Sequence, residues 1–345
     1  MRSMIPDLRL RLLGDAPRVA LVSLALFALA GCAAPRPHLL PEAVVAEAAP
    51  PTVSDVASTP AAEDDDDSSK MSLSEVNKEL TNPVSSLWSI TVQQNNNLVT
   101  TGPGGPTLYS PNLFFQPVVP VALTGDWNLI TRPVIPLFVS RQHPVPGKGY
   151  VEATAGIGDI ILAQMLSPSP KLVGGWLLGL GPTWIFPAAS SFWTGQGKWQ
   201  VGPAALAGYL SDKWILGAFA QNWTSFGGSG PRSTNGMNLQ PFASYFLPDG
   251  WSVGYSGNIL ANWKATGGNA WTVPVGLQVA KVVKLGPLPV RFALAGQYMV
   301  VNPREFGQKW NIQLVIAPVL PKLVRGNLLE PDSLQFGMPK HPPAP

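Results

Sequence analysis

The sequence predicts an all-β protein, an antiparallel transmembrane β-barrel of about 12 strands with a disordered N-terminal leader and one short helix. Three observations predict this fold class. Apolar residues alternate with small or polar residues over most of the chain after Leu87. Turn-rich segments separate these stretches, and aromatic residues collect at their ends. Charged residues make up only 12% of the chain, so its surface is not suited to water alone.

The N-terminus has the order of a secretory signal, with Arg9, Arg11 and Arg18 before an apolar run at 19–30 and small residues after it. The letters "LAGC" end at Cys32 and resemble a bacterial lipobox. This resemblance implies a signal peptide over 1–31, cleavage before Cys32 and lipidation of the Cys32 thiol. The alternative is an ordinary secretory signal cut after a nearby alanine, with Cys32 incidental. Both interpretations predict export.

Residues 32–70 are rich in Ala, Pro, Ser and acidic residues, a composition that cannot bury a core and indicates a disordered linker. The acidic run at 63–67 lacks the glycine and the ligand spacing of a calcium loop, so solvated carboxylates are the preferred interpretation. The single cysteine excludes an internal disulfide, and the three dispersed histidines do not indicate a metal cage. We therefore predict no cofactor and no metal site.

The segment 72–80 predicts an amphipathic helix, because Leu73, Val76 and Leu80 lie near helical spacing and Ser72 with Glu75 forms a capping box. This helix precedes the first strand, and we expect it to plug or brace the periplasmic opening of the barrel. We assign residues 71–323 to the barrel including this helix, and 324–345 to a proline-rich C-terminal tail.

The clearest strand signal is "WSVGYSGNILANW". One face carries Trp251, Val253, Tyr255, Ile259, Ala261 and Trp263; the other carries Ser252, Gly254, Ser256, Asn258 and Asn262, with Leu260 as the exception. The same pattern recurs in "VRFALAGQYMV", "KWNIQLVIA", "LVGGWLLGLGPTWIF" and "WSITVQQNN". In a soluble sheet the apolar face is a core, whereas in an outer-membrane barrel it faces lipid.

Tryptophans near the segment ends suit anchoring at the membrane interface. They are Trp127, Trp184, Trp199, Trp214, Trp251, Trp263, Trp271 and Trp310. Prolines inside the segments oppose the barrel, because each removes a ladder donor. They are Pro117, Pro133, Pro203, Pro241 and Pro274, and we expect the strands to bend there or these residues to lie near the rims.

A family resemblance extends over residues 73–323. It rests on "WNLITRPVIPL", "GIGDIILAQMLSPS", "GPTWIFPAAS", "GQGKWQVGPAA", "LQPFASYFLPDGWSV", "NWKATGGNAWTVPVGLQVAKVVKLGPLPV" and "WNIQLVIAPVLPK", which occur in this order. These segments resemble a bacterial outer-membrane family catalogued as phenol-degradation meta-pathway proteins or transporters, some of them labelled neuromedin U. The resemblance implies an outer-membrane barrel and the transport of hydrophobic or aromatic compounds. It implies no catalytic residues.

Four residues are candidates for the lumen: Gln93, Arg132, Asn258 and Arg291. Gln93 begins an amide cluster at 93–97, which either lines water in the lumen or leads into an exposed loop. Both arginines lie on the face opposite to apolar neighbours, and an arginine facing lipid near the midplane costs about 2–4 kcal/mol. In the lumen they either bias passage toward anions or form structural ion pairs. Asp159 is a lumen or a rim charge.

Enzyme chemistry is not predicted. Ser140 and His143 lie close together in "VSRQHPVPG", but no third orienting group is identifiable and His143 precedes Pro144 in a predicted turn. The "GIGD" at 156–159 lacks the glycine spacing of a nucleotide loop. A barrel hydrolase using His143 is a third hypothesis.

The sequence therefore predicts a channel in the outer membrane of a Gram-negative-type bacterium. The expected partners are membrane lipid and a small hydrophobic or aromatic solute. Nucleic acid is not expected, because lysines and arginines do not cluster. No oligomeric state is predicted. The alternative function is a lipid-anchored, non-transporting lipoprotein, either a β-barrel or a β-sandwich.

Overall fold

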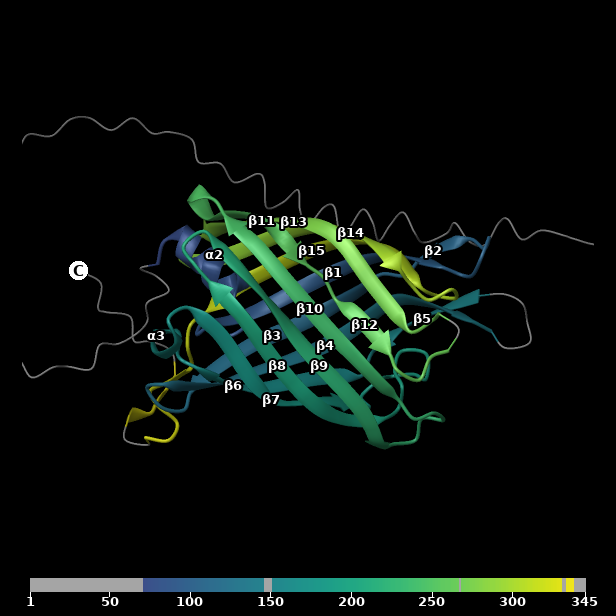
Figure 1. Cartoon of the computed structure of the whole chain (residues 1–345), viewed down its shortest axis with the longest axis horizontal. Helices are drawn as coiled ribbons and strands as arrows, with labels where there is room; N and C mark the ends of the chain where they lie inside the picture. The colour runs from purple at the N-terminus through teal and green to yellow at the C-terminus, as the bar shows by residue number, and fades with distance from the viewer. Residues whose placement is uncertain (1–70, 146–150, 267, 331–332, 338–345) are drawn as a thin grey trace, which may run out of the picture. The chain divides into compact units, whose positions relative to one another are not determined.

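The computed structural model describes residues 71–145, 151–266, 268–330 and 333–337 (Figure 1). The predicted signal peptide, Cys32 and the linker 32–70 lie outside the described residues. Among the described residues, helices are short, and none is long and apolar enough to cross a membrane.

Most described residues belong to strands, which run diagonally around one barrel (Figure 1). The strands are β1 (Trp88–Thr100), β2 (Thr107–Tyr109), β3 (Asn112–Ala122), β4 (Trp127–Pro144), β5 (Val151–Ile157), β6 (Ile160–Pro168), β7 (Trp176–Phe186), β8 (Trp199–Leu210), β9 (Trp214–Gly227), β10 (Asn235–Phe246), β11 (Trp251–Ser256), β12 (Ile259–Asn262), β13 (Trp271–Leu285), β14 (Leu288–Val301), β15 (Gln308–Leu320), β16 (Val324–Arg325) and β17 (Gln335–Phe336). The helices are α2 (Leu73–Thr81), α3 (Pro170–Val173) and the 3-10 turn η2 (Pro248–Gly250).

The sheet closes on itself as a 12-strand antiparallel barrel. Strands β5 and β6 follow one another along β4, and β11 and β12 together fill one position between β10 and β13. The first barrel strand pairs with the last, so that Val92 of β1 lies opposite Ile316 of β15. The predicted fold class is therefore confirmed. The β-sandwich alternative is wrong, because a single closed sheet replaces two packed sheets.

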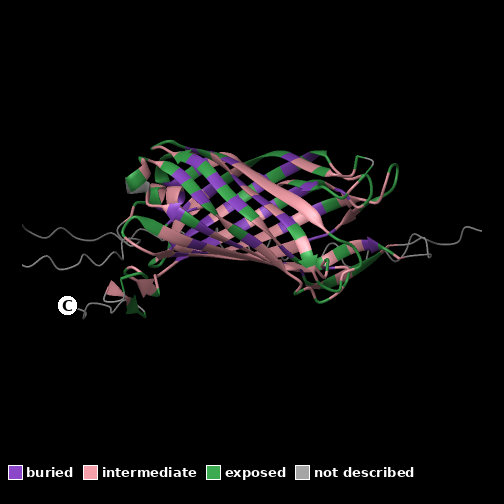
Figure 2. Cartoon of the chain, turned by 60° about the horizontal axis from the view of Figure 1, so that its bottom comes forward, coloured by how far each residue is buried: buried purple, intermediate pink, exposed green. Residues whose placement is uncertain are grey.

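Side chains alternate between the lumen and the outer surface, and Figure 2 shows buried and exposed residues alternating along the strands. In β14 the predicted polar face is buried, with Arg291, Ala293 and Gln297 all less than a tenth exposed. The opposite face carries Leu294 and Val300, which are 46% and 53% exposed. An outward apolar face and a polar interior are the arrangement that a barrel needs in lipid.

The two ends of the barrel differ. Connections at one end, such as 123–126, 211–213 and 286–287, are short, whereas 101–111 and 187–198 at the other end are long. We call these the short-turn end and the long-loop end. Exposed tryptophans occur near both, with Trp127, Trp176, Trp214 and Trp251 starting strands at the short-turn end and Trp199, Trp263, Trp271 and Trp310 lying at the long-loop end. This distribution forms two aromatic girdles.

Helix α2 lies at the short-turn end (Figure 1). It begins with the capping box that the sequence predicted. Ser72 Oγ accepts a hydrogen bond from the Glu75 N–H, and Glu75 Oε2 accepts one from the Ser72 N–H. The apolar face of the helix packs against the barrel through Val76, which contacts a cluster that includes Val282 and Val319. Packing of this face against the wall stabilises a helix too short to be stable alone.

The prolines lie inside strands rather than at rims, and three of them fall in a gap of a ladder. The β3–β4 register runs to Phe115 opposite Ile135 and resumes at Val119 opposite Thr131, so that Pro117 and Pro133 fall in the gap. The β8–β9 register also pauses, between Val201 and Ala204, so that Pro203 falls in a gap there. Pro274 lies at a register shift between β13 and β14, and Pro241 keeps Ala218 as its partner. The wall thus tolerates the missing donors by local interruptions of its ladders rather than by placing proline at its ends.

Part of the tail is structured. Strands β16 and β17 form a small hairpin, and the N–H groups of Leu328 and Leu329 donate to the carbonyls of Ala122 and Leu123. This segment therefore docks on the turn after β3, at the short-turn end. The predicted proline-rich tail gave no reason to expect either the hairpin or its contact with this turn.

Candidate functional site

Described residues line two neighbouring cavities in the barrel interior. The larger has a volume of about 300 Å³ and lies toward the long-loop end, and the smaller, of about 140 Å³, lies toward the short-turn end. The end of α2, from Glu79 to Asn82, lines the smaller cavity. Gln93, Arg132 and Asn258, which the sequence suggested for the lumen, line the larger cavity, and Arg291 lines the smaller.

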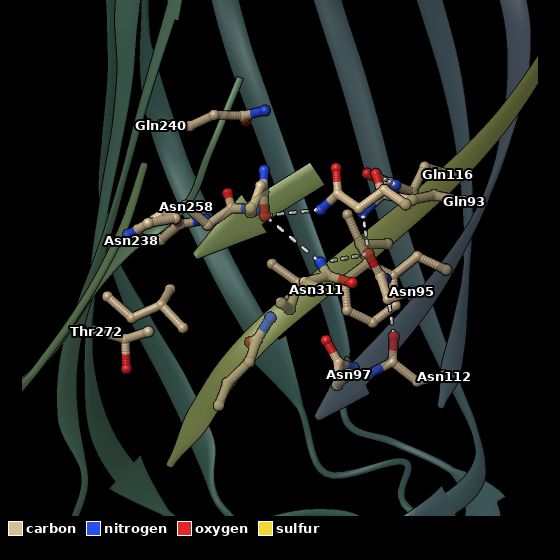
Figure 3. A pocket seen from close by; sticks show the side chains of 18 of the residues that line it. Gln93, Asn95, Asn97, Asn112, Gln116, Asn238, Gln240, Asn258, Thr272 and Asn311 are labelled. Carbon is tan, nitrogen blue, oxygen red and sulfur yellow. Dashed lines mark hydrogen bonds between the residues drawn. The ribbon is translucent and has the colours of Figure 1, made fainter. Parts of the chain in front are cut away.

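The larger cavity is lined mainly by amide side chains, several of which are labelled in Figure 3 together with Thr272. These amides are Gln93, Asn95, Asn97, Asn112, Gln116, Gln221, Asn238, Gln240, Asn258, Gln297, Gln308, Asn311 and Gln313. Those in strands reach the lumen because they alternate with outward residues, as Asn311 does between Trp310 and Ile312. An amide carries both donors and an acceptor, so this lining can hydrate or bind a polar solute of either hydrogen-bonding type.

Hydrogen bonds join these amides into a network across neighbouring strands (Figure 3). Asn95 is its centre, because its Oδ1 accepts from Gln93 Nε2 at 2.8 Å and from Asn311 Nδ2 at 3.3 Å, while its Nδ2 donates to Asn112 Oδ1 at 2.8 Å. Gln297 extends the network by accepting from Gln313 and donating to the Ser256 carbonyl. The network holds the amides in fixed positions, which a disordered polar lining would not do.

Arg132 supplies the only charged side chain among the described residues that line the larger cavity. Its guanidinium lies over the Phe219 ring, with 5.5 Å between the guanidinium carbon and the ring centroid. Its Nη1 is buried and has no hydrogen-bond partner among the described residues. The ion-pair alternative for Arg132 therefore finds no support in the described part of the chain, where the one ion pair joins Lys78 and Asp212.

Arg291 has a different role, because it fastens α2 to the barrel wall. Its Nε donates to Asn77 Oδ1 at 3.2 Å and its Nη2 donates to Gln278 Oε1 at 3.2 Å. Asn77 in turn donates from Nδ2 to the Gly250 carbonyl at 3.0 Å. Both Asn77 and Arg291 are buried, so these bonds are shielded from competing water. Sequence analysis placed Arg291 in the lumen but gave no signal for its partner on the helix.

His143 lies in β4 and not in the turn that the sequence predicted. It is buried, its ring stacks on Trp193 with 3.9 Å between centroids, and its Nε2 lies 2.8 Å from Thr154 Oγ1. Asp159 lies at the rim, where its carboxylate accepts from the backbone N–H groups of Ala189 and Gln196. Both residues thus fasten the long loop 187–198. Within the described residues, no group of three His, Cys, Asp or Glu side chains is arranged to hold a metal.

The fold and the interior together define a class of protein. A closed antiparallel barrel with an apolar outer band, aromatic girdles and a polar lumen has the architecture of outer-membrane β-barrel proteins.

Solved structures of this class are similar to the chain at low identity. The COG4313 outer membrane channel from Pseudomonas putida F1 shares 16% identity and a TM-score of 0.48, over 68% of this chain and 94% of that one. The NanC porin is 10% identical in sequence with a TM-score of 0.39, and the match covers 67% of this chain and 98% of the porin. A FadL homologue from Pseudomonas aeruginosa is 11% identical in sequence with a TM-score of 0.29, and the match covers 70% of this chain and 92% of the homologue. The chain matches no protein-family model and no curated protein. The resemblance to phenol-degradation meta-pathway proteins therefore stays a prediction.

Proposed function

We propose that this protein is a channel of the bacterial outer membrane that lets small solutes cross passively. The observation that carries the proposal is the amide-lined cavity inside a closed barrel whose outer face is apolar. A barrel that served only as an anchor would gain more stability from a packed apolar interior, because buried amides return little net free energy. In this proposal the long loops face outward and the short turns face the periplasm.

Helix α2 narrows the short-turn end in this proposal. Its C-terminal residues line the smaller cavity, and the Arg291–Asn77 contact holds it to the wall. An apolar cluster that includes Ile130, Met165 and Phe242 fills another part of the interior. Solutes that cross must therefore be small, or the helix must move. The hydrophobic or aromatic solute inferred from the family resemblance is part of this proposal, and the aromatic rings of Phe114 and Phe219 in the larger cavity support it.

Leakage of small solutes from proteoliposomes tests the channel. We expect liposomes that contain the folded full-length protein to release a small sugar or amino acid faster than empty liposomes. Deletion of residues 72–80 should raise the rate further, and an unchanged rate would argue against a plug. Heat-modifiable gel migration checks that the barrel is folded in both preparations. Rates equal to those of empty liposomes for the full-length and the deleted protein would refute the channel.

Two alternatives have separate tests. A non-transporting barrel held by a lipidated Cys32 predicts that Cys32→Ala releases the protein to the soluble fraction, whereas an integral barrel still needs detergent. A hydrolase that uses His143 predicts that His143→Ala abolishes lipid hydrolysis. The stacking of His143 on Trp193 supports a structural role instead.

A further inference from the structure

The two cavities meet at four side chains. Gln93, Gln116, Arg132 and Gln240 line both the larger and the smaller cavity, so a solute that moves between the cavities must pass them. Figure 3 shows Gln240 on one side of the lumen and Gln93 with Gln116 on the other. We call these four residues the cavity junction. Three of its members are neutral amides, and Arg132 supplies its one charge.

Within the described part of the chain, the positive charge at the junction forms no ion pair. No acidic side chain is among the described residues that line the larger cavity. Glu79 lines the smaller cavity, but its Oε2 accepts a hydrogen bond from Ser85 Oγ at 2.7 Å, at the end of α2. A buried guanidinium N–H without an acceptor is unfavourable, and a carboxylate is the acceptor whose planar geometry matches a guanidinium best. The junction is therefore suited to an anion.

An apolar strip lies beside this charge. Phe114, Val134, Ile161, Ala163 and Phe219 line the same cavity as Arg132, and the Phe219 ring contacts the guanidinium. A small hydrated ion would leave this strip unused. A neutral hydrophobic molecule would cover the strip but leave Arg132 without an acceptor. Only a solute with both a carboxylate and an apolar body satisfies the charge and the strip together.

We propose that the cavity junction is a binding site for small monocarboxylates with a compact apolar or aromatic body. The carboxylate accepts hydrogen bonds from the Arg132 guanidinium, the body lies against the apolar strip, and the amides opposite hold any further polar groups. The proposal rests on the proposed channel function only in that the site lies on the path of a solute, and it names the class of solute.

Binding of benzoate to the detergent-solubilised full-length protein, measured by isothermal titration calorimetry, tests the site without requiring passage. Benzamide is the neutral analogue of nearly the same shape, and acetate keeps the charge but lacks the body. We expect benzoate to bind more tightly than either. Arg132→Gln should weaken benzoate binding by about ten- to hundredfold, and Arg132→Lys should weaken it less because the charge remains.

Arg141→Gln is the matched control. Arg141 also lies over a phenylalanine ring, Phe138, with 4.7 Å from the guanidinium carbon to the centroid, but it lines neither cavity. Its replacement should leave the affinity for benzoate unchanged. Heat-modifiable migration of each variant shows that the barrel has formed, so that a loss of affinity reports on the site.

Several outcomes would overturn the site. Equal affinities for benzoate and benzamide would remove the role of the charge, and equal affinities for benzoate and acetate would indicate an adventitious ion only. An unchanged affinity in Arg132→Gln would exclude Arg132. Benzoate binding without any leakage from proteoliposomes would leave the site standing and refute the channel. Leakage without charge-dependent binding would refute the site and leave the channel standing.

Discussion

Replacing Asn77 with alanine should loosen α2 from the barrel while leaving the barrel folded. The side chain of Asn77 is fully buried, accepts from the Arg291 guanidinium and donates to the Gly250 carbonyl. A hydrogen bond to a charged group contributes about 1.5–3 kcal/mol and a neutral one about 0.5–1.5 kcal/mol. Asn77→Ala should therefore reduce the free energy of helix docking by about 2–4 kcal/mol.

Hydrogen exchange of the α2 amides measures this loss, because their exchange follows the local opening of the helix. A decrease of about 2–4 kcal/mol corresponds to about 30- to 700-fold faster exchange, at tenfold per 1.4 kcal/mol. Lys78→Ala on the same helix is the control, because Lys78 pairs with the fully exposed Asp212 at 3.7 Å and should change the rate by less than about twofold. An acceleration below about threefold in Asn77→Ala would refute the assigned role of this contact.

Three further predictions concern stability. Gly250→Ala should lower the melting temperature, since Gly250 has a φ of +75° and an added Cβ would lie 3.1 Å from the Leu73 Cβ; an unchanged melting temperature would contradict this. Arg132→Met should stabilise the barrel by about 1–3 kcal/mol in urea unfolding, because it removes a buried charge without a partner; a loss of stability would mean that Arg132 serves the fold. The hydrogen bonds from Ser72 lower the pKa of Glu75 below its usual value. The Glu75 carboxylate therefore stabilises α2 above the unfolded-state pKa, and this stabilisation is lost as the pH falls through the lowered pKa. Glu75→Gln should flatten the pH dependence of hydrogen exchange in α2, and an unchanged pH profile would exclude the capping box as the source of that dependence.

The barrel wall was predictable from the sequence because strand periodicity is local. Alternation in β14 and β15 assigned the inward and outward faces correctly, and the even number of segments suits a barrel with both chain ends on one side. In β12, Leu260 is the apolar residue that the sequence placed on the polar face. It faces the lumen, as its position predicts, and lines the larger cavity. The breaks within single strands, at 158–159 and 257–258, were not predictable, because they depend on the register of neighbouring strands.

The interior was predictable by residue type but not by partner. Period two placed Arg132 and Arg291 on inward faces, yet nothing local distinguishes their roles. Arg291 meets Asn77 across 214 positions of sequence, whereas Arg132 lies at the junction of two cavities. His143 illustrates the same limit, since its neighbour Pro144 predicted a turn while the pairing with Glu152 of β5 keeps it in a strand. Such distinctions arise only from contacts between distant segments.

The pairing of β1 with β15 has a consequence for biogenesis. The seam joins the two ends of the barrel sequence, and the Asn311–Asn95 bond spans it with 216 positions between the partners. Neither strand has a complementary edge until the whole chain is present, and closing so long a loop is entropically slow. A chain shortened before β15 would expose the edge of β1 to other chains and would aggregate. Closure of the barrel therefore depends on β15, its last wall strand.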